Sequence, residues 1–218
     1  MRWMREAIRR RRADDDGFTL PELLISMTIF AAFLAVITAT VTTMMQDIRH
    51  TTTVNQAASQ NQRAFDNFDK EIRPAFAVNY PGLGTNGADF YIEFETYALN
   101  GAALCRQWRL IVATDQLQER SWPVITSGAP TLSAWTGVAT GIVNTTNPFK
   151  LFLPADYAQS DTVQLTLIDT QGVKPTATAN TSTTVVAENT DANTPSNLDG
   201  NGNGVSDNPA CQIGVNRP

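Results

Sequence analysis

The feature that most constrains this chain is an uncharged apolar run near its N-terminus. Leu23 to Met45 contains 23 residues without one ionisable side chain. As a helix, this run would be about 35 Å long at roughly 1.5 Å per residue, enough to cross a hydrocarbon core of about 30 Å. The run therefore predicts a helix that can span a bilayer.

The charges on either side of the run predict its orientation. Six arginines precede it, whereas the segment just after it offers Asp47, Arg49 and His50. Because positive flanks stay in the cytoplasm, the N-terminus should be cytoplasmic and the rest of the chain should be exported. A secretory signal typically has a shorter run that ends in small residues of Ala-x-Ala type, and that pattern is absent between Leu23 and Asp47. We therefore expect no cleavage after the run.

A carboxylate stands at the edge of the run. Glu22 would cost a few kcal/mol at the edge of a spanning helix unless a partner pairs with it. If the chain were cut between Gly17 and Phe18, the new α-amino group could be that partner. The alternative is a plain anchor with a chance glutamate, which leaves the carboxylate unexplained.

The order of residues around this carboxylate resembles the N-terminus of type IV prepilins and of the related pseudopilins of type II secretion and competence systems. It consists of a basic leader, Gly17, Phe18, Thr-Leu-Pro, Glu22 and an apolar helix. The resemblance implies that prepilin peptidase cuts after Gly17 and that Phe18 becomes the methylated first residue. It also implies that Glu22 meets the terminal amine of a neighbouring subunit during assembly.

The resemblance further implies partners and a location. The partners are prepilin peptidase, other pilins or pseudopilins bound through their N-terminal helices, the inner-membrane assembly platform, and membrane lipid before assembly. The chain should be a single-pass cytoplasmic membrane protein with an extracytoplasmic C-terminal head. It would then join a pilus or pseudopilus at the cell surface or in the periplasm. The formal net charge of −5 argues against direct contact with nucleic acid.

The chain should divide into three parts. We expect a cleaved basic leader at 1–17, a transmembrane and filament-core helix at 18–46, and a soluble head at 47–218. In the head, apolar residues spaced by four and three predict a helical face that Pro74 ends near Arg73. The residues of this face are Val54, Ala58, Asn61, Phe65, Phe68 and Ile72.

Beyond the helix the periodicity changes to two. Strands are predicted near 90–95, 104–114, 116–122, 149–153, 162–168 and 183–188, with loop or short irregular elements over 123–147. The expected fold is α+β and pilin-like, with a long N-terminal helix, half transmembrane and half amphipathic, packed on an antiparallel β-sheet head. The head should be β-rich over 88–188 and have a loose C-terminal tail over 170–218. This order most resembles a minor pilin or a J-type minor pseudopilin.

One segment of the tail has the spacing of a calcium loop. Ala210 replaces the bidentate glutamate at position twelve, so another segment would have to contribute, for which Asp191 is the candidate. The alternative is a hydrophilic Asn-Gly turn. The resemblance adds that calcium sites occur in some pilins and pseudopilins, so Ca²⁺ binding is an open prediction. We expect no required cofactor. The oxygen-bearing side chains at positions one, three, five and nine, with glycine at six, are Asp199, Asn201, Asn203 and Asp207, with Gly204.

The two cysteines, Cys105 and Cys211, both belong to the exported part. An even number of cysteines outside the cytoplasm favours a disulfide, which would tie the tail to the second strand. The alternative is two separate thiols, one buried and one exposed.

The sequence offers little for catalysis, so we expect no enzyme. The single histidine, His50, lies just outside the membrane, and Glu93 with Glu95 is expected to be solvated strand charge rather than a glycosidase pair. Three tryptophans (Trp108, Trp122 and Trp135) could form a sugar platform, although core packing is the commoner role. We expect a minor pilin or pseudopilin that assembles in a filament tip or initiation complex. Two alternatives to this role stay open. One is a surface adhesin, and the other is a membrane-anchored carbohydrate-binding or hydrolytic protein with a prepilin-like targeting segment.

Overall fold

The computed structural model describes residues 17–125, 128–154, 159–169 and 179–211. Residues 1–16 of the expected leader and residues 170–178 and 212–218 of the expected tail lie outside this part. The chain divides into two compact units, Met1–Thr51 and Thr52–Pro218. The first unit holds the N-terminal part of the long helix, and the second holds the end of the helix and the head.

The long helix α2 spans Leu20–Ile72. Its first turn begins at Thr19, whose carbonyl accepts hydrogen bonds from the backbone N–H groups of Glu22 (3.0 Å) and Leu23 (3.1 Å). Pro21 is tolerated there because the first turn of a helix needs no backbone donor. The helix begins two residues after the predicted start at Phe18, and the predicted end near Arg73 is confirmed to within one residue.

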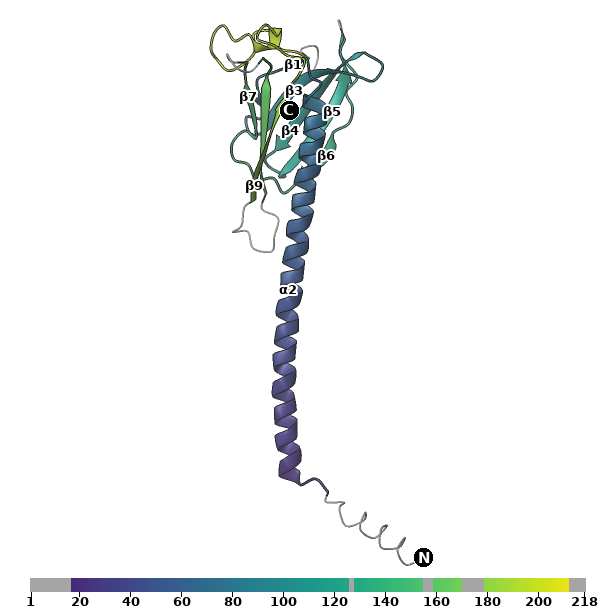
Figure 1. Cartoon of the computed structure of the whole chain (residues 1–218), viewed down its shortest axis with the longest axis vertical. Coiled ribbons are helices and arrows are strands. Elements are labelled where there is room, and N and C mark those ends of the chain that lie inside the picture. Colours follow the sequence, from purple (N-terminus) through teal and green to yellow (C-terminus); the bar gives the residue numbers. More distant parts are fainter. Residues whose placement is uncertain (1–16, 126–127, 155–158, 170–178, 212–218) are drawn as a thin grey trace, which may run out of the picture. The chain divides into compact units, whose positions relative to one another are not determined.

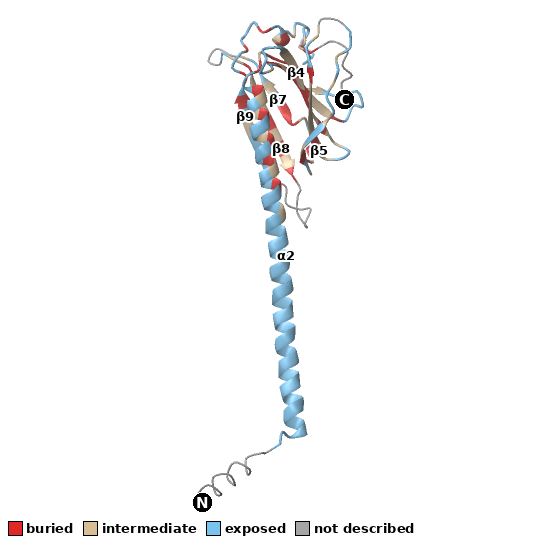
Figure 2. Cartoon of the chain, turned by 90° about the vertical axis from the view of Figure 1, so that its right-hand side faces the viewer, coloured by how far each residue is buried: buried red, intermediate tan, exposed pale blue. Residues whose placement is uncertain are grey.

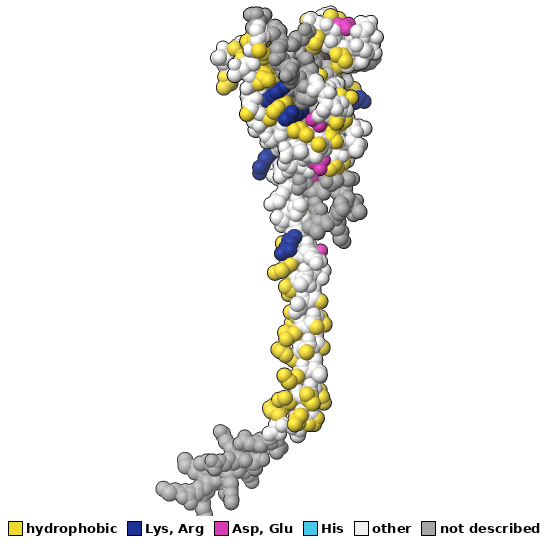
Figure 3. Space-filling model, turned by 180° about the vertical axis from the view of Figure 1, so that it is seen from behind, with side chains coloured by type: hydrophobic (Ala, Val, Ile, Leu, Met, Phe, Trp, Pro, Cys, Tyr) yellow, Lys and Arg dark blue, Asp and Glu magenta, His cyan; other side chains and the backbone are white. Residues whose placement is uncertain are grey.

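The part of α2 that lies in the first unit is exposed throughout (Figure 2). On the face seen in Figure 3, hydrophobic side chains cover this part of the helix. By length and composition, α2 is apolar enough to cross a membrane. Its hydroxyl groups bond to carbonyls three or four residues earlier, for example Thr38 to Leu34 (2.8 Å) and Thr40 to Val36 (2.9 Å). They therefore need no water in a hydrocarbon environment.

The strands of the head form two antiparallel sheets (Figure 1). The six-stranded sheet has the order β1-β3-β4-β5-β6, and β2 also pairs with β3. Its strands are β1 (Ala77–Val78), β2 (Gly82–Leu83), β3 (Phe90–Tyr97), β4 (Ala103–Ile111), β5 (Gln116–Pro123) and β6 (Thr136–Thr140). The three-stranded sheet has the order β7-β8-β9 and consists of β7 (Phe149–Phe152), β8 (Thr162–Asp169) and β9 (Ala179–Val186). A short 3-10 helix, η1 (Pro195–Asn197), follows.

The strands β3, β4, β5, β7 and β8 confirm the predictions, and two predictions are wrong. The segment 123–147, expected to be loop or short irregular elements, contains β6, which pairs with β5 across a register shift between Leu117 and Gln118. Gly137 and Ala139 of β6 have weak strand propensity, so its backbone pairing with β5 decides its structure. The last strand begins at Ala179, four residues before the predicted start, because it pairs with β8 along its whole length.

The face of α2 that packs on the sheets differs from the predicted face. Its buried residues are Ala57, Asn61, Ala64, Phe68 and Ile72. Val54 and Ala58 are exposed, so the prediction is wrong at these two positions, whereas the half-buried Phe65 packs against the core. The prediction followed large apolar side chains, whereas the helix turns small alanines toward the strands. Small side chains allow the helix backbone to approach closely.

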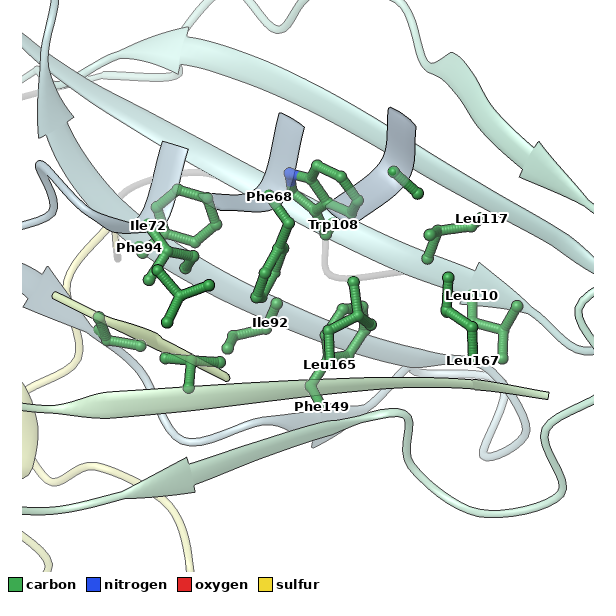
Figure 4. Close-up of a cluster of buried hydrophobic side chains, with 14 of the residues drawn as sticks. Phe68, Ile72, Ile92, Phe94, Trp108, Leu110, Leu117, Phe149, Leu165 and Leu167 are labelled. Carbon is green, nitrogen blue, oxygen red and sulfur yellow. The ribbon is translucent and has the colours of Figure 1, made fainter. Parts of the chain in front are cut away.

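Phe68 of α2 lies at the centre of the main core (Figure 4). Its ring meets that of Trp108 on β4 edge to face, with ring centres 5.1 Å apart. It also stacks on Phe149 of β7, at 6.1 Å. One helix residue therefore contacts both sheets. Other core residues, among them Leu110, Leu165 and Leu167, are fully buried around it.

Candidate functional site

The predicted processing site is described from Gly17 onward. Gly17 is exposed, and a Cβ atom added to it would meet no heavy atom within 4 Å in the described structure. Nothing in the described fold therefore requires glycine at this position. Phe18 is 80% exposed, so its ring is likewise available to a partner outside the chain.

Glu22 lies in the first turn of α2. A negative charge is favourable there because the N-terminal N–H groups of a helix carry partial positive charge. Within the described residues, the carboxylate of Glu22 has no hydrogen bond or ion pair. An ionised carboxylate without a partner is costly in lipid. Pairing with the amine of Phe18 in a neighbouring subunit stays a prediction.

The two cysteines form a disulfide between Cys105 of β4 and Cys211. This bond connects the middle of the six-stranded sheet to a residue 106 positions later. The two sulfurs pack with Trp122 in a small second core, which Leu132 and Ala210 border. The pairing favoured by the sequence is therefore the one present in the structure.

Asn79 holds the same part of the tail by hydrogen bonds. Its amide donates to the carbonyl of Ala210 (2.9 Å) and its Oδ1 accepts from the Ala210 N–H (2.8 Å). The same amide donates to Glu93, which also accepts from Gln107 at 2.7 Å. Glu93 is fully buried, so the expectation of a solvated strand charge is wrong at this position. The amides satisfy its buried carboxylate, as burial of a charge demands.

Two acidic residues that the sequence analysis did not single out, Glu71 and Glu119, lie where the end of α2 meets the six-stranded sheet. Glu71 accepts hydrogen bonds from Arg106 and, at 2.7 Å, from Trp108 Nε1. Burial nevertheless raises the pKa of Glu71. Glu119 on the neighbouring strand has a buried Oε2 atom without a hydrogen-bond partner among the described residues. Burial first and the charge of Glu71 second raise the pKa of Glu119 to about 7, against a smaller opposing effect of Arg106.

The raised pKa of Glu119 predicts a pH-dependent stability. Since its folded pKa lies above its unfolded value of 4.5, the fold loses stability as pH rises from about 4.5 to about 7, and the full penalty is present above about 7. Glu119→Gln should therefore match the wild type at about pH 4 and be more stable at about pH 8. The expected difference is on the order of 1 kcal/mol, after discounting for partial solvent screening. Urea unfolding of the full chain in detergent at both pH values measures it. Asp66→Asn, which changes an exposed carboxylate of α2, is the control and should leave the pH dependence unchanged.

The predicted calcium loop is a compact turn held by its own side chains. The two carboxylate oxygens of Asp199 accept from the N–H groups of Asn203 (3.0 Å) and Gly204 (2.9 Å). Asp207 accepts from the N–H of Gly200 (2.7 Å), and Gly204 has the left-handed φ of 74° that glycine permits. Asp191, the additional ligand suggested by the sequence, instead caps its own turn by accepting from Asn193.

Calcium binding by this loop stays a prediction. In the part of the chain that the structure describes, no three His, Cys, Asp or Glu residues lie together as a metal-binding group. The described loop therefore offers two carboxylates and two amides. This is a weak donor set by comparison with loops that end in a bidentate glutamate.

The three tryptophans of the head do not share one surface. Trp108 is fully buried against α2. Trp122 is buried beside the disulfide. Trp135 is half-buried, and its ring centre lies 3.8 Å from the guanidinium group of Arg109 and 4.3 Å from that of Arg120. These positions do not form the row of exposed rings that a sugar platform requires. The carbohydrate-binding alternative loses this support.

Residues 12–38 match the family model described as the prokaryotic N-terminal methylation motif. The match includes Gly17, Phe18 and Glu22, together with the first turns of α2. The comparisons with curated proteins and with solved structures returned no match. Residues 12–38 are thus the class III signal peptide of type IV pilins and pseudopilins, on a chain whose α+β layout is consistent with a pilin-like fold.

Proposed function

We propose that this chain is a minor pilin or minor pseudopilin, which prepilin peptidase processes and which then assembles in a tip or initiation complex. The N-terminal methylation motif supports a pilin-like or pseudopilin-like protein that undergoes this processing. The observation that carries the proposal is the combination of a glycine that the described fold does not need with a carboxylate that has no partner there. Both residues make sense if their partners are other proteins.

The apolar part of α2 supports the assembly step. Its large hydrophobic side chains are exposed on the isolated chain, among them Ile25 (60%), Phe30 (62%) and Phe33 (62%). Lipid can cover such a surface before assembly, and helices of other subunits can replace lipid afterwards. In a filament core without water, a charge pair between Glu22 and a neighbouring amine would fix the axial register of the subunits.

The proposed role is mechanical and organisational, without catalysis. Glu93 is tied to Asn79 and Gln107, so it is not free to act with Glu95 as an acid and base pair. His50 is an exposed residue of α2, just after the apolar segment. The genes that neighbour the gene of this chain would show whether the subunit serves a pilus, a competence system or a secretion system.

The processing step is tested by Gly17→Ala. We expect this variant to stay full-length in the membrane with a normally folded head, because the extra methyl group meets nothing in the described fold. Mass spectrometry of the membrane-extracted protein measures where the chain begins. Gly137→Ala is the matched control, since its added methyl group is also unobstructed, and it should be processed normally. Mature protein of normal size from Gly17→Ala would refute the cleavage assignment.

The assembly step is tested by Glu22→Val in the same strain. Cleavage should continue, whereas incorporation into sheared filaments, measured by immunoblot, should fall at least about tenfold if the lost charge pair is worth 1.4 kcal/mol or more. Asp47→Val removes a carboxylate later in α2 and should have a smaller effect. Undiminished incorporation of Glu22→Val would remove the assembly role of Glu22.

A further inference from the structure

A cavity of about 530 Å³ lies beside the disulfide. Its floor is a row of residues paired across four strands of the six-stranded sheet: Ala77 on β1, Glu95 on β3, Cys105 on β4 and Trp122 on β5. Because side chains alternate along a strand, this row faces away from the core that contains Trp108. The walls are rich in proline and come from three separate segments, with Pro123 and Pro130, Pro195, and Pro209.

Glu95 is the one charged residue among those that line the cavity. Its side chain is half-buried, and in the described part of the chain its carboxylate has no hydrogen bond or ion pair. Burial raises the pKa of Glu95, and no neighbouring cation opposes this effect. Glu93, two residues earlier on the same strand face, shows the contrast, since amides of Asn79 and Gln107 satisfy its carboxylate. Among the described residues, the carboxylate of Glu95 therefore lacks the hydrogen-bond partners that Glu93 has.

A second polar group of the cavity also lacks a partner. Ser196 of η1 lines the cavity, is 1% exposed, and has an Oγ atom without a hydrogen bond in the described structure. Leaving a hydroxyl buried without a partner costs free energy, so a donor that enters the cavity would relieve this cost. Trp122 supplies an aromatic ring, and aromatic rings attract cations.

We propose that this cavity binds a basic side chain, lysine or arginine, of a partner polypeptide. The proline residues of the walls and the tryptophan of the floor suit the methylene stem of such a side chain. The carboxylate of Glu95 pairs with its charge, and the hydroxyl of Ser196 accepts one of its N–H groups. An acidic ligand is repelled by Glu95, and a neutral apolar ligand leaves the carboxylate without a partner.

The rim of the cavity favours a polypeptide over a free amine. Phe76 lines the cavity and stacks on Tyr97, with ring centres 4.4 Å apart. Tyr97, at the end of β3, is 61% exposed, and Val124, just after β5, is 38% exposed. One ion pair at a partly exposed site contributes little by itself. Stable binding therefore needs the backbone and neighbouring side chains of a polypeptide against this aromatic rim.

The test is peptide binding to the full chain in detergent micelles, followed by NMR. The probes are three blocked pentapeptides, in which two alanines flank a central lysine, arginine or norleucine on each side. We expect the lysine or arginine peptide to bind at least about tenfold more tightly than the norleucine peptide. Glu95→Gln should abolish this preference, whereas Asp66→Asn, which removes an exposed carboxylate of α2, should retain it.

Several outcomes would overturn the proposal. These are equal binding of the charged and neutral peptides, no binding of any peptide, or a charge preference that persists in Glu95→Gln. Hexylamine that binds as tightly as the basic peptides would reject the polypeptide as ligand. Urea unfolding of Glu95→Gln shows that the variant is folded, and in the wild type the preference should weaken as salt is raised. Since the purified chain is used, the result is independent of the proposed processing and assembly.

Discussion

Phe68→Ala should destabilise the head by about 3 to 5 kcal/mol. Phe68 is fully buried and touches both Trp108 on the six-stranded sheet and Phe149 on the three-stranded sheet. Truncation would remove the buried ring and leave a cavity at the point where α2 meets both sheets. Urea unfolding of the full chain in detergent, followed by tryptophan fluorescence, measures the loss because Trp108 reports on this contact.

The matched control is Phe152→Ala. Phe152 lies at the end of β7, is 41% exposed, and contacts the ammonium group of Lys150 at 4.7 Å. The same substitution there removes a ring that already faces solvent, so its cost should be about 1 kcal/mol or less. Equal costs for the two variants would show that α2 does not organise the core of the head.

The prediction of α2 succeeded because its two limits are local. Pro21 and Glu22 suit the first turn of a helix, and Pro74 prevents its continuation. The strands β3 and β8 could likewise be predicted from the sequence, since apolar and polar residues alternate along them. Such patterns require only neighbours in sequence. In contrast, the short strands β1 and β2 exist only because β3 pairs with them, and two residues cannot show a period.

The head sites were harder to predict because their members are far apart in sequence. Glu71 meets Arg106 and Trp108, which lie 35 and 37 residues later. Asn79 meets Ala210 across 131 residues. From sequence alone, Glu93 and Glu95 are equivalent, whereas in the structure one is satisfied and the other lines a cavity. Burial, rather than residue type, makes this difference.

The processing segment is the opposite case. Gly17, Phe18 and Glu22 lie close together in the sequence, and their spacing was sufficient to indicate the signal peptide that the family model also matches. The structure adds one argument, which is that glycine at position 17 has no role inside the described fold. A residue type that the described fold does not require at its position is a candidate for recognition by another protein.

Removing the disulfide by the double substitution Cys105→Ala and Cys211→Ala should destabilise the head by about 4 kcal/mol. The bond closes a segment of 106 residues, and a loop of roughly that length restricts the unfolded chain by about 4.7 kcal/mol. Alanine avoids placing a hydroxyl group where Cys105 is 1% exposed. Urea unfolding with and without reductant measures the effect, and reductant should destabilise the wild type but not the double variant. A double variant within about 1 kcal/mol of the oxidised wild type would contradict this prediction.

The disulfide has a second expected effect because it does not hold the tail alone. The two hydrogen bonds between Asn79 and Ala210 should keep the tail near β1 after the bond is lost, so the head should still fold. However, Pro209 and Cys211 are part of the cavity wall, and the covalent bond fixes Cys211 to the floor at Cys105. The double variant should therefore lose the preference for basic peptides while it remains folded. Adding Asn79→Ala to the double variant should release the tail, which an increase in amide hydrogen exchange at Ala210 would show.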